Sequence, residues 1–153
     1  MAIPIEQFPQ FWKKAQDRLA KNTAELIADA TIEAGKELLE RCPVRRGRLH
    51  VNFKISDNEG EAERYQERTA IDSKGAQRGG NYTIALAKMR AKRRAIEQAL
   101  QAEKPIFLAN STPYLYLTRR KINYQRVAEK AFDDILKKDD KRDILLKGIG
   151  DPV

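Results

Sequence analysis

The residue types best suited to nucleophilic chemistry occur once each in this chain, as Cys42 and His50. A thiol nucleophile needs a base within hydrogen-bond reach, and only this pair could supply one. Cys42 falls at an expected helix end, where a small buried apolar residue is ordinary, and His50 falls on the polar face of an expected strand. A single cysteine and a single histidine also leave no intrachain disulfide and no Cys/His metal cluster. We therefore predict no catalytic residue, no metal site, no cofactor and no enzymatic activity.

Acidic side chains gather between residues 57 and 72, where six Asp or Glu residues and two Arg residues give a net charge of −4. Carboxylates are ligands for divalent cations, but these lack the ligand spacing and turn glycine of a calcium loop. The chain also lacks the glycine-rich motifs that cradle phosphates. We interpret the segment as a solvated acidic loop.

A basic stretch follows within residues 74–104, which carry eight basic and two acidic residues, a net of +6. The cations expected to meet an anionic partner or to line a DNA channel are Lys88, Arg90, Lys92, Arg93 and Arg94. Clustered cations bind DNA by neutralising phosphates and releasing counterions. An acidic protein face and a merely solvated helix remain alternatives. No aromatic residues interleave with the cluster, which disfavours a single-strand stacking platform.

A long helix must precede these segments, because apolar residues recur at spacings of three, four and seven between Gln7 and Arg41. Two prolines near the N-terminus place its firm start near Gln10. About 30 helical residues extend roughly 45 Å, which exceeds the width of a small domain. Part of the helix should therefore project or lie against another subunit.

A turn and a strand follow that helix. Pro43 disfavours helix at the preceding residue, and Gly47 provides backbone freedom for a turn. Apolar and polar residues then alternate over 49–56, which predicts a strand with one buried face. The apolar run 106–109 predicts its partner strand, whereas 114–118 suits either a third strand or a helix beginning at Pro113.

The remaining elements complete a predicted α+β domain over 1–138, with a long N-terminal helix, a small antiparallel or mixed sheet, an inserted basic helix and a C-terminal helix covering the sheet. We expect a loop over 57–80 with a short helix at 61–69, and a basic helix over 84–102 that packs through Ala87, Ala91, Ala95 and Ala99. The C-terminal helix is expected over 123–138. Residues 139–153 form a tail whose apolar residues dock on a neighbour or on the same core.

Two segments carry a resemblance to a known family. The string Pro43-Val44-Arg45-Arg46-Gly47-Arg48-Leu49-His50-Val51-Asn52-Phe53-Lys54-Ile55-Ser56 and the later Asn110-Ser111-Thr112-Pro113-Tyr114 resemble the tail-completion and neck proteins of tailed bacteriophages. That family usually has Thr where Arg46 stands, and an acidic residue and a glycine after the tyrosine that corresponds to Tyr114. This chain lacks both of the latter residues.

The resemblance implies a structural virion protein that forms a ring, typically of six subunits, between the head connector and the tail. It would be found in the virion neck or tail and, during assembly, in the host cytoplasm, with non-specific contact to DNA in transit. The residues assigned to oligomer or partner contact are Arg45, Arg46, Gly47, Arg48, Asn110, Pro113 and Tyr114. A small basic DNA- or RNA-binding module is the alternative. No apolar run approaches the roughly 20 residues that span a bilayer, so we expect no membrane association.

Overall fold

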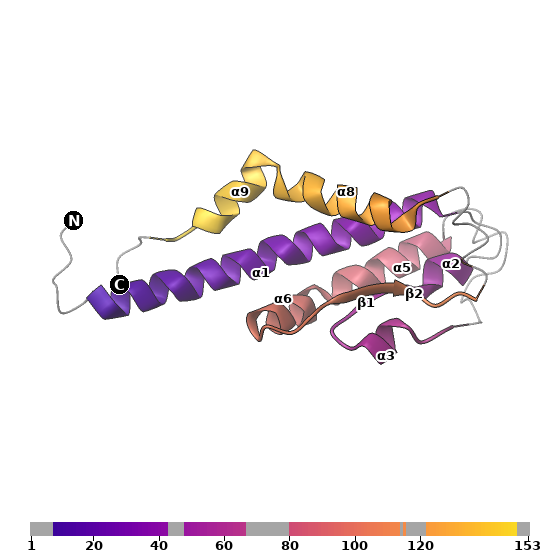
Figure 1. The fold of residues 1–153 in the computed structure, drawn as a ribbon, viewed down its shortest axis with the longest axis horizontal. Coiled ribbons are helices and arrows are strands. Elements are labelled where there is room, and N and C mark those ends of the chain that lie inside the picture. Colours follow the sequence, from indigo (N-terminus) through magenta and orange to yellow (C-terminus); the bar gives the residue numbers. More distant parts are fainter. Residues whose placement is uncertain (1–7, 43–47, 67–79, 114, 116–121, 150–153) are drawn as a thin grey trace.

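The structure is a computed structural model that describes residues 8–42, 48–66, 80–113, 115 and 122–149. Its main feature is helix α1 (Phe8–Arg41), which runs through the molecule and extends past the other elements at its N-terminal end (Figure 1). The predicted long helix is confirmed, with its start two residues before Gln10. The predicted α+β fold is confirmed as well.

The two halves of α1 have different surroundings. From Asn22 onward buried residues recur on both sides of the helix, whereas residues 9–21 are exposed apart from the half-buried Phe11 and Ala15. Helices α8 (Tyr124–Leu136) and α9 (Asp139–Leu146) lie along one side of α1, and the remaining elements lie along the other (Figure 1). Other elements therefore cover α1 on two sides along its C-terminal half, but not along its N-terminal half.

The predicted strand over 49–56 is half wrong. Its first part is a short helix, α2 (Arg48–Asn52), and only β1 (Phe53–Ser56) is extended. The expected polar face is also wrong, because His50 and Asn52 are 2% and 0% exposed. Asn52 replaces its lost water contacts with two bonds to the backbone of Gln66, donating at 2.8 Å and accepting at 2.7 Å.

The predicted pairing of the two strands is confirmed. Strand β2 (Phe107–Asn110) pairs with β1 in antiparallel register, with Phe53 opposite Asn110 and Ser56 opposite Phe107. Residues 114 and 116–118 lie outside the described part of the chain, so the third strand stays a prediction.

The segment between the strands forms three helices in its described part. Helix α3 (Glu59–Ala62) is shorter and earlier than the predicted 61–69, and the Asn58 side chain caps it by accepting from the Glu61 N–H at 3.0 Å. The predicted helix over 84–102 is divided into α5 (Gly80–Ala91) and α6 (Arg93–Gln101). At the break, the Lys92 N–H bonds to the Met89 carbonyl three residues back.

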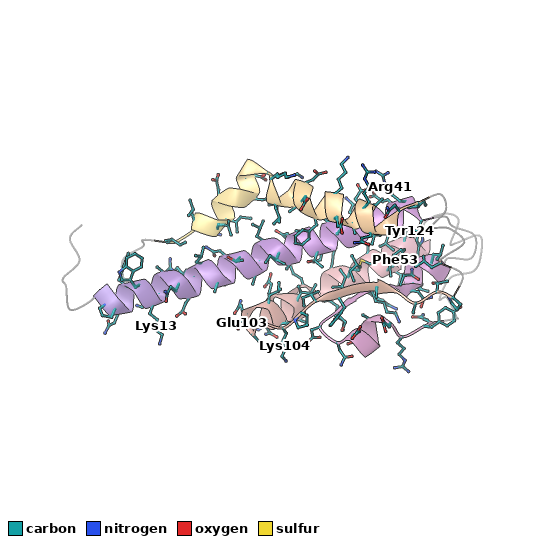
Figure 2. The ribbon with its side chains drawn as sticks, viewed as in Figure 1. Lys13, Arg41, Phe53, Glu103, Lys104 and Tyr124 are labelled. Carbon is teal, nitrogen blue, oxygen red and sulfur yellow. The ribbon has the colours of Figure 1, made fainter. Side chains whose placement is uncertain are left out.

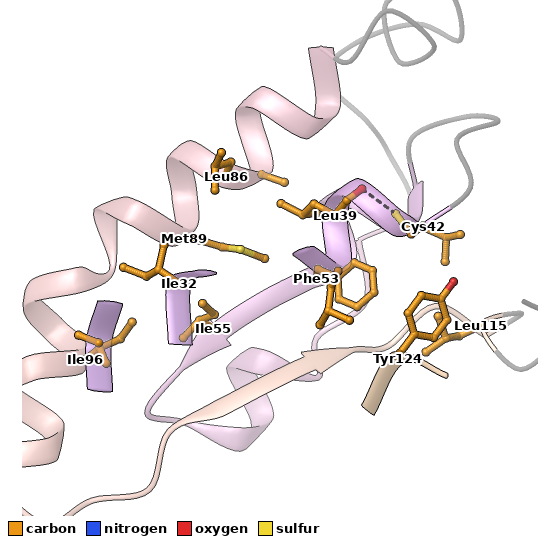
Figure 3. Packing of buried hydrophobic residues seen from close by; sticks show 14 residues of the cluster. Ile32, Leu39, Cys42, Phe53, Ile55, Leu86, Met89, Ile96, Leu115 and Tyr124 are labelled. Carbon is orange, nitrogen blue, oxygen red and sulfur yellow. Dashed lines mark hydrogen bonds between the residues drawn. The ribbon is translucent and has the colours of Figure 1, made fainter. Parts of the chain in front are cut away.

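The predicted C-terminal helix is confirmed as α8, which begins after the cap Asn123. Its predicted role as a cover for the sheet is not: it lies chiefly along α1, and its first residue, Tyr124, touches Phe53 of β1 edge to face with ring centroids 5.8 Å apart. Both residues are labelled in Figure 2, and Figure 3 shows their rings side by side. The expected tail contains α9, and Leu145 packs on the buried cluster of Leu26, Ala30 and Ile135. The described tail thus docks on its own chain.

The main core lies between α1, β1 and α5 (Figure 3). Met89 of α5 is 2% exposed and lies beside Gly35 of α1, where an added Cβ would come within 2.7 Å of the methionine sulfur. Gly35 therefore permits close approach of the two helices. None of the helices in the described ranges combines the length and apolar character needed to cross a membrane.

Candidate functional site

The two segments that carry the family resemblance meet at the end of the sheet. Asn110 is the last residue of β2, and its amide donates to the Leu49 carbonyl of α2 at 2.9 Å. Its side-chain oxygen also accepts from the Thr112 N–H at 2.9 Å. Asn110 therefore ties α2 to the turn that follows β2, a role that its polar type alone did not reveal.

The other predicted contact residues are only partly described. Arg45, Arg46, Gly47 and Tyr114 lie outside the described residues, and Arg48 is placed only as the first residue of α2. Pro113 is exposed in the turn after Asn110. The structure thus joins the two segments through Asn110 and leaves the arginine turn as a sequence-based prediction.

Cys42 and His50 both point at one backbone carbonyl. The Cys42 Sγ–H donates to the Leu39 oxygen at 3.5 Å, and the His50 Nε2 bonds to the same oxygen at 3.0 Å (Figure 3 shows the Cys42 bond). Burial raises the pKa of the Cys42 thiol to about 12, only partly opposed by a backbone hydrogen bond. A thiol with that pKa forms no appreciable thiolate at neutral pH, so this arrangement favours a structural role for both residues.

The five cations of the basic stretch do not form one continuous surface. Lys88 and Lys92 line a pocket beside β1, and Lys92 also forms an ion pair with Glu61 of α3 at 2.8 Å. Arg90 is exposed on another side of α5 and lies near enough to Tyr82 for its charge to lower the pKa of that phenol. Burial and a hydrogen bond to Glu40 raise the pKa of Tyr82 by more.

The last two cations, Arg93 and Arg94, also have different surroundings. Arg93 forms ion pairs with Asp29 of α1 and with Glu97 of its own helix, whereas Arg94 is exposed. Arg93 was expected to face a partner and instead joins α6 to α1. Lys88, Arg90 and Arg94 remain available to an anionic partner.

The predicted packing row of alanines is wrong. Ala87, Ala91 and Ala95 are exposed, and only Ala99 is buried. The core side of these helices is formed by larger residues, Leu86, Met89 and Ile96 among them, because long side chains remove more apolar surface from water than alanine does. The break at Lys92 also changes the helical phase that the spacing of four assumed.

A pocket of about 670 Å³ lies between β1, the α3 region and α5. Apolar side chains form part of its lining, among them Val51, Ile55, Ala85 and Met89. Its polar lining includes the cations Lys54, Arg64, Lys88 and Lys92 and a single carboxylate, Glu61. The combination suits a ligand that has both an apolar group and negative charge.

The electrostatics of this pocket are unbalanced. Burial, followed by the neighbouring charges of Lys88 and Arg64, lowers the pKa of Lys54. Hydrogen bonds from Lys92 and Ser56, the second at 2.9 Å, hold the pKa of Glu61 below its usual value. One carboxylate, already bonded to Lys92, therefore faces three further cations.

Sequence reasoning missed Lys54 and Arg64 as members of this site. Lys54 was placed on the polar face of the predicted strand, and Arg64 was counted as an exception in an acidic segment. Arg64 interrupts that run of acidic residues, and this interruption is the sequence feature that could have identified it as a site residue. The packing of α5 and of α3 against β1 brings both residues to Lys88.

No group of three or more His, Cys, Asp or Glu side chains suited to hold a metal ion occurs among the described residues. Comparison of the chain with protein-family models, with curated proteins and with solved structures finds no match.

Proposed function

We propose that this chain is a structural protein of the neck or tail end of a tailed phage, acting by packing and charge without catalytic turnover. In this proposal several copies form a ring, typically six, that joins or completes the tail at the head connector. Arg45, Arg46, Gly47, Arg48 and Tyr114 would contribute contacts between subunits or with the adjoining rings.

The observation that carries the proposal is the hydrogen bond from Asn110 to the Leu49 carbonyl. It joins the two segments that resemble the neck and tail-completion family, although they are separated by 61 residues. Two segments that belong to one family motif but lie far apart in the sequence should meet in the folded chain and form one structural unit. The resemblance is thereby supported by spatial proximity as well as by residue order.

The projecting start of α1 gives further support. Trp12 and Leu19 lie on it and are 56% and 44% exposed. Scattered exposed hydrophobic residues are ordinary, but Trp12 lies in the first turns of α1, which extend past the other helices, and Leu19 lies beside Arg18, where the helix meets Gly148. A neighbouring subunit in a ring would cover them.

The test is genetic and biochemical. A phage that encodes this chain should carry it in purified particles, and a null mutant should accumulate heads and tails that fail to join or tails that fail to be completed. Crosslinked particles should give a ladder that ends at one closed oligomer. Persistent absence of the chain from purified particles would exclude the virion role.

A DNA- or RNA-binding module is the second candidate, favoured by the exposure of Lys88, Arg90 and Arg94. Isolated protein would then bind a nucleic-acid duplex with an affinity that falls steeply with salt, because bound counterions are released. A neck subunit would show no such binding before assembly. Fluorescence anisotropy at several salt concentrations distinguishes these two functions.

A further inference from the structure

We infer that the pocket between β1, α3 and α5 receives helix α9 of a second copy of this chain, with Leu146 as the apolar anchor and Asp140 and Asp143 as the counter-charges. The inference rests on the proposed self-assembly and specifies which surfaces meet.

The pocket requires a ligand with two properties. Its apolar lining can bury an aliphatic side chain, and its four cations are balanced by only one carboxylate in the lining. Glu61 is engaged by Lys92 at 2.8 Å, and within the described part of the chain neither Arg64 nor Lys88 forms an ion pair. A bound segment must therefore bring an apolar residue with carboxylates beside it.

Helix α9 has that combination on one face. Leu146 is 69% exposed, the largest exposed fraction among the large hydrophobic residues described. Asp143 precedes it by three residues and Asp140 by six, and residues three apart are neighbours on a helix surface. Both carboxylates are exposed, and neither forms an ion pair with another described residue.

The exposed leucine is held in position by α1. The buried amide of Asn22 donates to the carbonyls on either side of Leu146, to Leu145 at 3.1 Å and to Lys147 at 2.9 Å. One helical turn earlier, Lys141 bonds to Asp29 at 3.4 Å. Because this segment is already ordered, docking it costs less conformational entropy than docking a mobile end.

The arrangement of the two surfaces favours contact between copies. The elements that line the pocket lie on the opposite side of α1 from α9 (Figure 1), so one molecule cannot fill its own pocket with that helix. Two different surfaces that meet form a heterologous contact, which builds a closed ring when the rotation permits. Charge favours α9 over the exposed start of α1, because α9 carries three aspartates against Lys141 and Arg142, whereas residues 8–21 carry four cations against the single acid Asp17.

Engineered cysteines test the contact directly. Ala91→Cys places a thiol at the pocket, and Lys147→Cys places one beside Leu146 and keeps that anchor; both positions are exposed, and native Cys42 is buried. The two variants are purified separately, mixed and oxidised, so that a bond between them must join two chains. We expect a disulfide-linked dimer, and no more than background with Ala95→Cys, which is exposed on α6 but does not line the pocket.

Charge reversal provides the second arm. We expect Lys88→Glu or Asp143→Lys alone to weaken self-association about tenfold in sedimentation velocity, and the double variant to regain it. Arg94→Glu and Asp133→Lys are matched controls, since both residues are exposed and lie off the two surfaces. Reversal controls that weaken association equally would assign the effect to net charge and overturn the inference.

Four other outcomes also decide the matter. A crosslink yield for Ala91→Cys no higher than for Ala95→Cys would overturn the contact. The contact would also be overturned if no crosslink forms and the protein binds a DNA duplex in a way that Lys88→Glu abolishes, because the pocket would then bind nucleic acid. The chain found in phage particles without this crosslink would retain the virion role and overturn only the contact. A specific crosslink in a protein absent from particles would support the contact and exclude that role.

Discussion

The guanidinium of Arg93 forms an ion pair with the carboxylate of Asp29, which joins helix α6 to the middle of α1. Lys141 of α9 approaches the other oxygen of the same carboxylate at 3.4 Å. Asp29 therefore connects elements from both sides of α1, and a cation expected to meet a partner stabilises the fold instead.

Replacing Arg93 should cost folding stability, whereas replacing Arg94 should not. Arg93→Ala leaves Asp29 with Lys141 as its charged partner, but the arginine side chain is 42% exposed and solvent screens the pair. We expect a loss of only about 1 kcal/mol. Arg94→Ala should stay within about 0.5 kcal/mol of wild type. Urea unfolding measures both, and equal midpoints for the two variants would remove the structural role of Arg93.

The single histidine should make the protein sensitive to mild acid. Burial lowers the pKa of His50, and the bond to the Leu39 carbonyl opposes this only in part. The unfolded chain therefore takes up a proton near the ordinary histidine pKa of about 6.5, while the folded chain stays neutral until lower pH. Stability should be fully present above about pH 6.5 and fall as pH decreases from there through the folded pKa.

Urea unfolding between about pH 7.5 and 5 tests this dependence, because no other side-chain type has an ordinary pKa in that window. His50→Gln keeps a donor for the Leu39 carbonyl and removes the titration. The variant should show a flatter dependence on pH than wild type. A wild-type slope unchanged by the substitution would assign acid sensitivity to another group.

Gly35 should not tolerate a branched side chain. An added Cβ meets the Met89 sulfur at 2.7 Å and Ile55 Cδ1 at 3.4 Å, so Gly35→Val overpacks the core. We expect a loss of about 1–3 kcal/mol in urea unfolding. Ala87→Val on the exposed side of α5 is the matched control, with an expected change within about 0.5 kcal/mol.

The source of that loss can be verified by a second substitution. Met89→Ala removes the side chain that Gly35→Val would strike, so the double variant should be more stable than the two separate losses predict. Strict additivity would show that Met89 does not limit position 35.

Asn110 should be required for the end of the sheet. Asn110→Ala removes the bond to the Leu49 carbonyl and the bond from the Thr112 N–H. Leaving these partly buried groups unpaired should cost about 1–3 kcal/mol. Pro113→Ala, exposed in the same turn, is the control and should change the unfolding midpoint little. A midpoint for Asn110→Ala that matches the control would contradict the link between the two segments.

The sequence was sufficient for elements with a sustained apolar period. Helix α1, helix α8 and the pairing of β1 with β2 all follow from repeats or runs of apolar residues that bury a face. The short segment 48–52 was mispredicted because a period of two counts His50 and Asn52 as solvent-facing. Their partners, Leu39 and Gln66, lie 11 and 14 residues away, and the alternation contains no information about them.

The candidate pocket could be predicted only in part. Lys88 and Lys92 were found because cations cluster in the sequence, but Lys54 and Arg64 join them through the packing of α5 and of α3 on β1. Arg93 belonged to the same cluster and yet faces α1, because helical phase and the break at Lys92 decide direction. Composition identified the charge, and tertiary structure determined which charges converge.

The antiparallel course of α8 and α9 along α1 has a consequence for synthesis on the ribosome. Asp29 and Lys141 are separated by 112 residues, and Arg18 bonds to Gly148 across 130 residues. At roughly 5–20 residues per second, the later partner emerges on the order of ten seconds after the earlier one. We therefore expect the nascent chain to cover α1 first on its sheet side, leaving Leu26 and Ala30 open to chaperones until Ile135 and Leu145 have left the ribosome.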